Sequence, residues 1–359
     1  MQAVRPQGGL GTLGFILPPT NRAGIPVKSG TTQGSTDGFA LAGGGGLFDL
    51  CRSLEDLGAG ALWAVDHLFW ATPMSECLTS LAVAAAATRT IPIGSCVLQL
   101  PLRSPAVVAR QAASIQTLSG GRFVLGVGVG THPGEYLAAG VDFARRGSLM
   151  DGALRELRRL WSGDADGGSR YRQLPVPEPV PVWIGGSSRI AIRRAATSGD
   201  GWIPMFITAD EYSKSLNYLR AETVAACRSP HDVTAAAVLF VSLNQHSNAK
   251  IEATEWMSGL FGISPKAFER HVIVGPAQHC AGEVERYLDA GAEHVAVMVA
   301  DDSPIDHFAA LLAAMRQSGS ISPDATAGDR AALDAGGQAP PIRVANEAGA
   351  HPPMEVAHD

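Results

Sequence analysis

The stretch IPIGSCVLQLPLRSPAVVARQAASIQTLSGGRFVLGVGVG, residues 91–130, decides the fold class. Apolar and β-branched residues at 91–98 and 122–130 are typical of buried strands, whereas the apolar residues of 104–121 recur at helical spacing. Ser104, followed by a proline, suits the N-terminus of that helix. Two strands joined by one helix form a crossover unit, and this indicates an α/β protein with parallel strands.

The same alternation of strand-like and helical segments continues along most of the chain. Strand-like runs are found at 11–17, 61–67, 91–98, 122–130, 181–186, 200–205, 233–243 and 294–300. Segments with helical spacing are found at 47–58, 75–88, 104–121, 148–163, 188–199, 208–227, 276–291 and 303–319. Eight such repeats in about 310 residues predict a (β/α)8 TIM barrel, and a doubly wound open sheet is the alternative.

Three segments interrupt this alternation. Residues 18–46 are rich in Gly, Thr and Ser, and after the first strand they would form a long connection on the catalytic face. Residues 244–272, after the seventh strand, carry aromatic side chains that would either shape a substrate pocket or pack on the barrel wall. Residues 321–359 have almost no large apolar side chains, which predicts a disordered tail after a barrel domain spanning 1–320.

Composition excludes several classes of protein. The formal net charge of −6 gives no basic excess to neutralise phosphates, so nucleic acid is not expected as a partner. The five cysteines are scattered and never form a C-x-x-C pair, which argues against a disulfide framework or zinc knuckle and favours a reducing compartment. No apolar run approaches the roughly 20 residues of a membrane span, and the N-terminus lacks a signal-peptide pattern. We therefore expect a cytoplasmic protein.

The stretch ALWAVDHLFW, residues 61–70, carries an apolar strand directly into Asp66 and His67. A buried pair of this kind costs roughly several kcal/mol unless both groups are hydrogen-bonded or face a wet cavity. The carboxyl ends of barrel strands are where such enzymes keep their reactive groups. We interpret the two residues as a catalytic pair rather than a structural one, because a neutral imidazole exchanges protons with a substrate hydroxyl.

Two glycine-rich segments are candidates for ligand binding. GVGVG at 126–130 lacks the third glycine of a dinucleotide fingerprint and is not followed at once by a helix, so nicotinamide binding is not indicated. In PVWIGGSSR at 181–189, a strand ends in two glycines and two serines at a helix N-terminus. The free N–H groups and hydroxyls there favour a phosphate cradle, with an ordinary helix cap as the alternative.

Further polar residues follow other predicted strands. His132 and Glu135 come after the fourth strand, and Asp301 and Asp302 after the eighth. Each could reach the same end of the barrel or remain solvated. No H-E-x-x-H or H-x-x-E-H cluster occurs, so a metal site is not indicated.

The block 91–163, with PVWIGGSS at 181–188 and GDGWIPM at 199–205, resembles the luciferase-like monooxygenase superfamily. Within it, the pattern is most similar to actinobacterial oxidoreductases that use the deazaflavin coenzyme F-420. The likeness extends over residues 9–318 and implies a barrel holding a flavin-like ring at the carboxyl ends of its strands. It also suggests a homodimer, because family members are often dimers.

The resemblance further implies a cofactor site with a cis peptide bond between Cys96 and Val97, behind the ring. It also implies that 185–188 form the phosphate-binding turn. The implied cofactor-binding residues are Asp66, Cys96, Val97, Gln99, Gly130, Thr131, Gly185, Gly186, Ser187 and Ser188.

His67 matches a histidine that lies over the reacting ring carbon in related dehydrogenases, so it is our candidate for proton transfer. The chain departs from those relatives in two ways. Trp70 stands three rather than four residues after the histidine, and Thr131 occupies the place of the catalytic glutamate. Threonine cannot replace a carboxylic acid at neutral pH, so Glu135 is our candidate substitute and His132 an alternative proton source. Trp70 and His132 are assigned to the substrate pocket.

These observations favour an F-420-dependent oxidoreductase that passes a hydride between the deazaflavin and a small or medium organic substrate. An FMN-dependent monooxygenase of the same superfamily is the first alternative. The second is a barrel that binds a cofactor without catalysis, because the family's acid is missing.

Overall fold

The computed structural model describes residues 5–6, 10–18, 46–70, 74–162, 176–301 and 303–321. The predicted tail and most of the predicted connection at 18–46 lie outside these residues. The strands are β1 (Leu13–Ile16), β2 (Leu62–Ala64), β3 (Ile93–Ser95), β4 (Leu98–Gln99), β5 (Phe123–Gly128), β6 (Val182–Gly185), β7 (Gly201–Ile203), β8 (Thr234–Ser242), β9 (Val272–Val274) and β10 (His294–Val299). The helices are α1 (Gly46–Leu57), α2 (Cys77–Ala87), α3 (Pro105–Leu118), α4 (Pro133–Ala138), α5 (Arg146–Trp161), α6 (Arg189–Ser198), α7 (Ala209–Ala225), α8 (Ala249–Phe261), α9 (Ala277–Asp289) and α10 (Pro304–Gln317).

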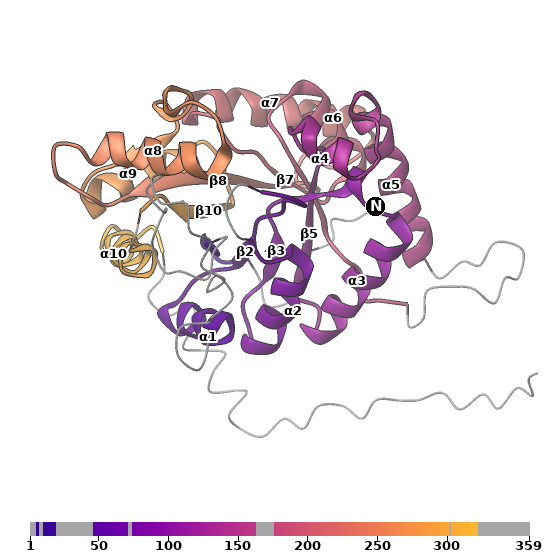
Figure 1. Cartoon of the computed structure of the whole chain (residues 1–359), viewed down its shortest axis with the longest axis horizontal. Coiled ribbons are helices and arrows are strands. Elements are labelled where there is room, and N and C mark those ends of the chain that lie inside the picture. Colours follow the sequence, from indigo (N-terminus) through magenta and orange to yellow (C-terminus); the bar gives the residue numbers. More distant parts are fainter. Residues whose placement is uncertain are drawn as a thin grey trace, which may run out of the picture.

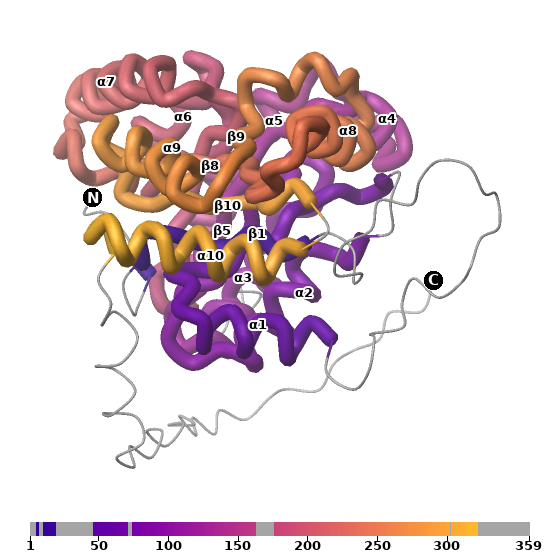
Figure 2. The backbone as a smooth tube through the Cα atoms, turned by 90° about the vertical axis from the view of Figure 1, so that its left-hand side faces the viewer, coloured from indigo at the N-terminus to yellow at the C-terminus, as the bar shows by residue number. Residues whose placement is uncertain are grey.

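Parallel strands form a closed barrel. They pair in the order β10, β1, β2, β3, β5, β6, β7 and β8, and β8 pairs with β10 again. The helices lie around the outside of the strands (Figure 1), and α10 lies between α9 and α1 (Figure 2), completing the ring. Closure confirms the predicted (β/α)8 barrel, because an open doubly wound sheet would leave two unpaired edges.

Successive strand residues point alternately toward the helices and into the barrel, which gives two apolar cores. In β2, Leu62 belongs to the outer core under the helices, whereas Trp63 belongs to the inner core. Trp63 and Trp183 lie with ring centroids 5.2 Å apart inside the barrel, and both are almost fully buried. The barrel interior is therefore filled with side chains below the level of the strand ends.

The strand predicted at 91–98 is interrupted. The peptide bond between Cys96 and Val97 is cis, as the family resemblance implies, and it separates β3 from β4. Strand β4 continues along β5, with Gln99 paired to Gly128. This break brings Gln99 to the carboxyl end of the barrel.

The predicted insertion at 244–272, after the seventh barrel strand, contains α8 and ends where the short strand β9 begins. Strand β7 pairs only with the start of β8, and β9 pairs with the end of β8 on the edge left open by β7. Met257 and Phe268 are buried in the inner core, so these parts of the insertion pack on the barrel wall. Phe261 remains partly exposed and meets Phe206, which follows β7, at 5.4 Å between ring centroids.

His294, the first residue of β10, is fully buried inside the barrel. Its Nε2 accepts a hydrogen bond from Trp63 Nε1 at 2.9 Å, and its Nδ1 lies 2.6 Å from the Gly11 carbonyl oxygen. Burial lowers the pKa of His294 from 6.5 to about 4, against the smaller opposing effect of the Gly11 hydrogen bond. The folded protein therefore keeps this imidazole neutral well below the pH at which the unfolded chain would protonate it.

We expect this histidine to make the fold less stable in acid. Because the unfolded state binds the proton first, stability falls as the pH drops below 6.5, and the loss approaches about 3 kcal/mol near pH 4. Denaturant unfolding of the wild type and of His294→Gln at several pH values measures this contribution. The variant should lose less stability on acidification, and equal pH slopes for the two proteins would contradict the assignment.

Candidate functional site

The site is built around the end of β2, where Asp66 and His67 follow the strand as predicted. His67 Nδ1 lies 2.9 Å from Glu135 Oε2, and the two side chains are 17% and 4% exposed. Glu135 belongs to the short helix α4, which begins just after β5. The structure therefore brings together two residues that are 68 positions apart in the sequence.

Glu135 is anchored by several donors besides His67. Its Oε1 accepts hydrogen bonds from the backbone N–H of Leu68 at 2.6 Å and from Gln99 Nε2 at 3.1 Å. Burial alone would raise the pKa of Glu135, but the hydrogen bonds from His67, Gln99 and Leu68 outweigh it and hold the pKa below its ordinary value. The carboxylate is consequently an ionised acceptor at neutral pH, not an acid.

This arrangement fixes the tautomer of His67. An ionised Glu135 only accepts hydrogen bonds, so His67 Nδ1 carries a proton that it donates to the carboxylate. Within the described residues, His67 Nε2 has no hydrogen-bond partner. The ring is therefore oriented with one nitrogen held by Glu135 and the other available for proton exchange.

Trp70 and His132, which we assign to the substrate pocket, lie beside the imidazole. The Trp70 ring stacks on His67 with centroids 3.5 Å apart, and His132 meets the Trp70 ring edge-on at 4.7 Å. Burial and the neighbouring His67 lower the pKa of His132, so its ring is neutral at pH 7. The apolar faces of these rings limit the access of water to one side of His67.

Asp66 lies in a second polar cluster beside the first. Its two carboxylate oxygens accept hydrogen bonds from Arg103 Nη2 at 2.7 Å and Nη1 at 2.8 Å. The backbone N–H of Gln99 donates to Asp66 Oδ2 at 2.8 Å. Arg103 was not identified from the sequence, because a single arginine after a strand matches no motif. The signal that could have pointed to Arg103 is the need of a buried carboxylate such as Asp66 for a positively charged partner.

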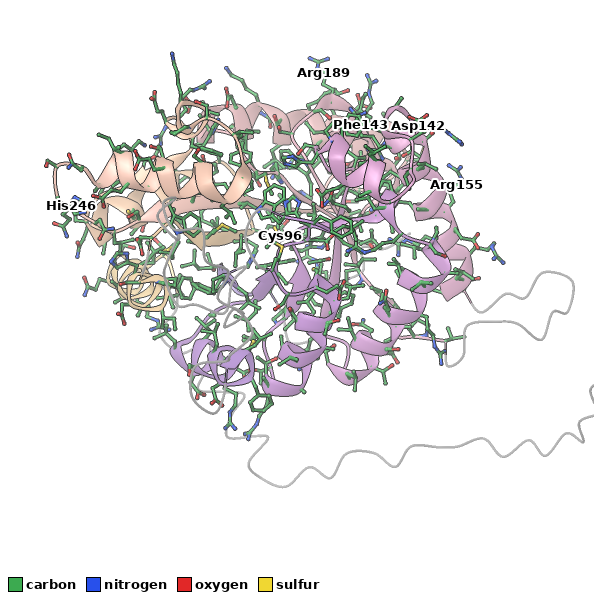
Figure 3. All side chains as sticks on the ribbon, in the orientation of Figure 1. Cys96, Asp142, Phe143, Arg155, Arg189 and His246 are labelled. Atoms are coloured by element: carbon green, nitrogen blue, oxygen red, sulfur yellow. The ribbon has the colours of Figure 1, made fainter. Side chains whose placement is uncertain are left out.

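Val97 and three glycines form the floor next to this cluster. A Cβ atom added at Gly128 would lie 2.6 Å from a Val97 methyl, and one added at Gly185 would lie 3.0 Å from both methyls. A Cβ atom added at Gly126 would lie 3.4 Å from a Val97 methyl. Figure 3 shows the preceding residue, Cys96, near the centre of the molecule. The absence of side chains at these glycines makes room for the Val97 side chain to pack against the backbone of β5 and β6.

This floor fits the flat ring that the resemblance implies. Glycine permits a close approach to the backbone. The side chain of Gln99 is buried, yet its Oε1 has no hydrogen-bond partner among the described residues. A Cβ atom at Gly130 would lie only 2.0 Å from this oxygen. A buried acceptor without a donor, beside a floor lined by glycine, suits a cofactor that offers an N–H group.

The predicted phosphate turn lies at the end of β6. Gly186 has a positive φ of 100°, and the Ser188 hydroxyl caps α6 by accepting from the Ala191 N–H at 3.2 Å. Ser187 is exposed. The cap geometry is therefore observed, and phosphate binding at 185–188 stays a prediction. The Arg194 guanidinium forms an ion pair with Asp151 at 2.6 Å.

The other polar candidates form no hydrogen bond with His67 within the described residues. Asp301 Oδ2 lies 2.5 Å from His307 Nδ1, and Asp302 lies outside the described residues. Thr131 is exposed. In the part of the chain that the structure describes, no group of three His, Cys, Asp or Glu side chains is placed to hold a metal ion. Nor is any described helix long and apolar enough to cross a membrane.

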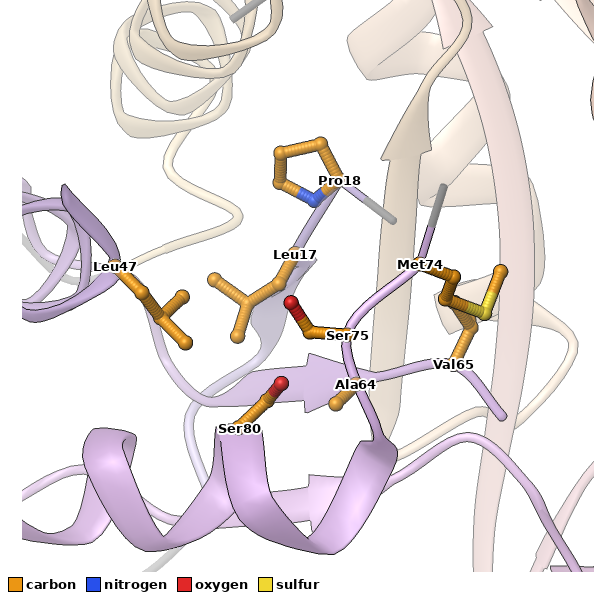
Figure 4. A pocket seen from close by; sticks show the side chains of 8 residues that line it. All are labelled: Leu17, Pro18, Leu47, Ala64, Val65, Met74, Ser75 and Ser80. Atoms are coloured by element: carbon orange, nitrogen blue, oxygen red, sulfur yellow. The ribbon is translucent and has the colours of Figure 1, made fainter. Parts of the chain in front are cut away.

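A small pocket, partly open to solvent, lies on the same face of the barrel (Figure 4). Its wall includes Val65, the residue before Asp66. The lining residues are Leu17, Pro18, Leu47, Ala64, Val65, Met74, Ser75 and Ser80. The pocket is therefore bounded by the ends of β1 and β2 and by the start of α2.

The closed parallel barrel, with a histidine and carboxylate at the ends of its strands, defines a (β/α)8-barrel enzyme. Residues 25–261 match the family model described as luciferase-like monooxygenase, and the chain belongs to this family. Its members are oxidoreductases or monooxygenases, so the chain is an enzyme of the oxidoreductase class.

The chain spans about half the length of the curated relatives that it matches. An uncharacterised protein of Mycobacterium tuberculosis is 38% identical over 139 residues, which are 36% of this chain and 48% of the relative. A phthiodiolone/phenolphthiodiolone dimycocerosates ketoreductase of Mycobacterium tuberculosis is 29% identical over 201 residues, 51% of this chain and 52% of the relative.

Solved structures share the fold at low sequence identity. An F-420-dependent secondary alcohol dehydrogenase, solved with an F-420–acetone adduct, superposes with a TM-score of 0.69 at 16% identity, covering 86% of this chain and 100% of that one. The EDTA monooxygenase of a Chelativorans species gives 0.67 at 15% identity, covering 88% and 95%. The fold is therefore common to an F-420-dependent dehydrogenase and a monooxygenase, and it does not distinguish these activities.

Proposed function

We propose that this enzyme transfers a hydride between coenzyme F-420 and a small or medium organic substrate, at a carbonyl or the corresponding alcohol. The observation that carries the proposal is the His67 imidazole, held through Nδ1 by the buried, ionised Glu135. The ketoreductase relative and the fold shared with an alcohol dehydrogenase support this choice of reaction.

When bound, the deazaflavin would supply or accept the hydride; the chain supplies the proton chemistry and the orientation. Val97 and the adjoining glycines would support the ring, and Gln99 Oε1 would accept a hydrogen bond from it. In the direction of reduction, protonated His67 donates a proton from Nε2 to the substrate oxygen, which becomes the alcohol hydroxyl. In the reverse direction, neutral His67 accepts that proton. Glu135 stabilises the positive charge on the ring.

Glu135 would thus supply a negative charge beside His67, and it would not replace the family's glutamate, at the position of Thr131, as an acid. It stands four residues further along, at the start of α4, and reaches back to His67. Because the carboxylate is ionised and accepts hydrogen bonds from His67, Leu68 N–H and Gln99, its role is to hold and charge-balance the imidazole. The proton donor is then His67 itself.

We expect Glu135→Gln to lower kcat by about 10- to 100-fold, because the amide keeps the shape but cannot stabilise a protonated imidazole. The loss should be measured as kcat against pH. In the wild type, the lowered pKa of Glu135 keeps its carboxylate ionised down to below pH 4.5. The negative charge is lost as the pH falls through the lowered pKa.

Glu156→Gln is the matched control for Glu135→Gln. It also removes a carboxylate whose pKa is lowered by hydrogen bonding, but Glu156 is partly exposed on α5 and pairs with Arg159. The control should keep wild-type kcat. Wild-type turnover in Glu135→Gln would remove Glu135 from the mechanism.

The choice of cofactor is tested by titrating the purified protein with F-420 and with FMN and following binding by fluorescence. Secondary alcohols from propan-2-ol to octan-2-ol then serve as hydride donors. We expect tighter binding of F-420 and its reduction without uptake of oxygen. Oxygen consumption with reduced FMN would instead identify a monooxygenase, and binding of neither cofactor would contradict both functions.

A further inference from the structure

The ion pair between Arg103 and Asp66 is one of the most enclosed in the described part of the chain. The Asp66 side chain is 0% exposed and that of Arg103 is 12% exposed. Both guanidinium contacts are below 3 Å, so the pair is bidentate. Neither residue forms a hydrogen bond or ion pair with Glu135.

The pair holds the backbone of Gln99 from both sides. Asp66 Oδ2 accepts the Gln99 N–H at 2.8 Å, and Arg103 Nη1 donates to the Gln99 carbonyl oxygen at 3.3 Å. Gln99 is the last residue of the two-residue strand β4, which has few ladder hydrogen bonds of its own. Its position therefore depends on Asp66 and Arg103.

The side chain of Gln99 connects this backbone to the proposed reactive pair. Its Nε2 lies 3.1 and 3.2 Å from the two oxygens of Glu135 and 3.3 Å from His67 Nδ1. A shift of Gln99 would therefore change the donors that surround Glu135. It would also move the unpartnered Gln99 Oε1, which we assign to the cofactor.

We propose that Arg103 is a positioning residue, which acts through Asp66 and Gln99 to hold the His67–Glu135 pair in its reactive arrangement. This inference rests on the proposed function of His67. Arg103 itself forms no hydrogen bond or ion pair with His67 or Glu135; its effect passes through two side chains and one backbone segment.

Electrostatics explain why the guanidinium cannot simply be removed. Burial raises the pKa of Asp66, and the charge of Arg103 and the Gln99 N–H oppose that rise. Without Arg103, Asp66 would be a buried carboxylate with no counter-charge and would take up a proton or move. Either change weakens its hydrogen bond with Gln99. Glu76 lies 3.8 Å from Arg103 but is 44% exposed, and it has the wrong sign to compensate.

The chain offers a matched control at the opposite end of the barrel. Arg158 pairs with the buried Asp200 at 2.5 Å, and Asp200 also accepts a backbone N–H, that of Val182, at 2.8 Å. Both Val182 and Asp200 lie where β6 and β7 begin, whereas Asp66 lies where β2 ends. Breaking this pair removes similar chemistry without touching the site.

The experiment compares Arg103→Met, Arg103→Lys and Arg158→Met in the enzyme loaded with F-420, with secondary alcohols as substrate. We expect Arg103→Met to lower kcat by about 10- to 100-fold with KM changed less than about threefold, since misplacement by about 1 Å is known to cost about this much. Arg103→Lys should be intermediate, because lysine cannot make the bidentate contact. Arg158→Met should keep kcat within about twofold of the wild type, even if its Tm falls.

A second measurement separates this inference from the proposed function. Nitrogen NMR of the His67 ring in the protein without coenzyme reports its tautomer and hydrogen bonding, and His67→Ala assigns the signal. Arg103→Met should shift this signal and Arg158→Met should not; an unshifted signal, or equal kcat in the two variants, would overturn the positioning role. Full activity in His67→Ala would refute the proposed function alone. If Arg103→Met does not fold, Arg103→Lys and Asp66→Asn are compared with Arg158→Met in its place, by kcat and by the His67 signal.

Discussion

Replacement of His67 by alanine should lower kcat by about 100-fold or more while leaving the protein folded. The variant removes the imidazole Nε2 that we assign to proton exchange with a substrate oxygen. Glu135 would keep its hydrogen bonds from Leu68 N–H and Gln99 Nε2, so no buried carboxylate is left without donors. The side chain of His67 is 17% exposed, and its loss opens no sealed cavity in the core.

The measurement is kcat with F-420 and the secondary alcohol that the wild type oxidises fastest, together with the Kd for F-420. A fall in kcat with little change in Kd is expected, because His67 acts on the proton and not on coenzyme binding. The matched control is His307→Ala, which removes another histidine paired with a carboxylate, Asp301, on the same face of the barrel. If His307→Ala were the inactive variant and His67→Ala the active one, the site would lie near β10.

The fold could be predicted from the sequence because strand and helix periods alternate with little ambiguity. Most predicted element ends lie within one or two residues of the observed ones, as for the helix predicted at 148–163 and found at Arg146–Trp161. Strand β9 could not be predicted. Its three residues are too few to show a period, and it forms because the end of β8 is left without a neighbour by β7.

The site was predictable only in part. Position at a strand end identified Asp66 and His67, because the carboxyl ends of all barrel strands meet on one face. The pairing of His67 with Glu135 depends on the direction of α4 after β5, and this direction cannot be predicted from the spacing of residues in the sequence. Arg103 is separated from Asp66 by 37 residues, and only the electrostatic cost of burying Asp66 pointed to such a partner.

The glycines around Val97 lead to a second large expected effect. Gly128→Val should lower the affinity for F-420 by about 100-fold, equivalent to about 2.7 kcal/mol, which lies within the usual cost of overpacking a closely packed site. Its Cβ atom alone would lie 2.6 Å from Val97 Cγ2, so Val97 must move into the space proposed for the ring. Fluorescence titration with F-420 measures the change in Kd.

The double variant Gly128→Val/Val97→Ala distinguishes this mechanism from general damage to β5. Removing the two Val97 methyls makes room for the new side chain, so the double variant should regain at least about tenfold of the lost affinity. Gly134→Ala is the control, since a Cβ atom there meets nothing within 4 Å. If Gly128→Val bound F-420 as tightly as the wild type, the ring could not lie against Val97, and the floor would be a packing feature of the barrel. If Gly128→Val weakened binding but Val97→Ala gave no recovery, the loss of affinity would be due to a distortion of β5 and of its pairing with Gln99.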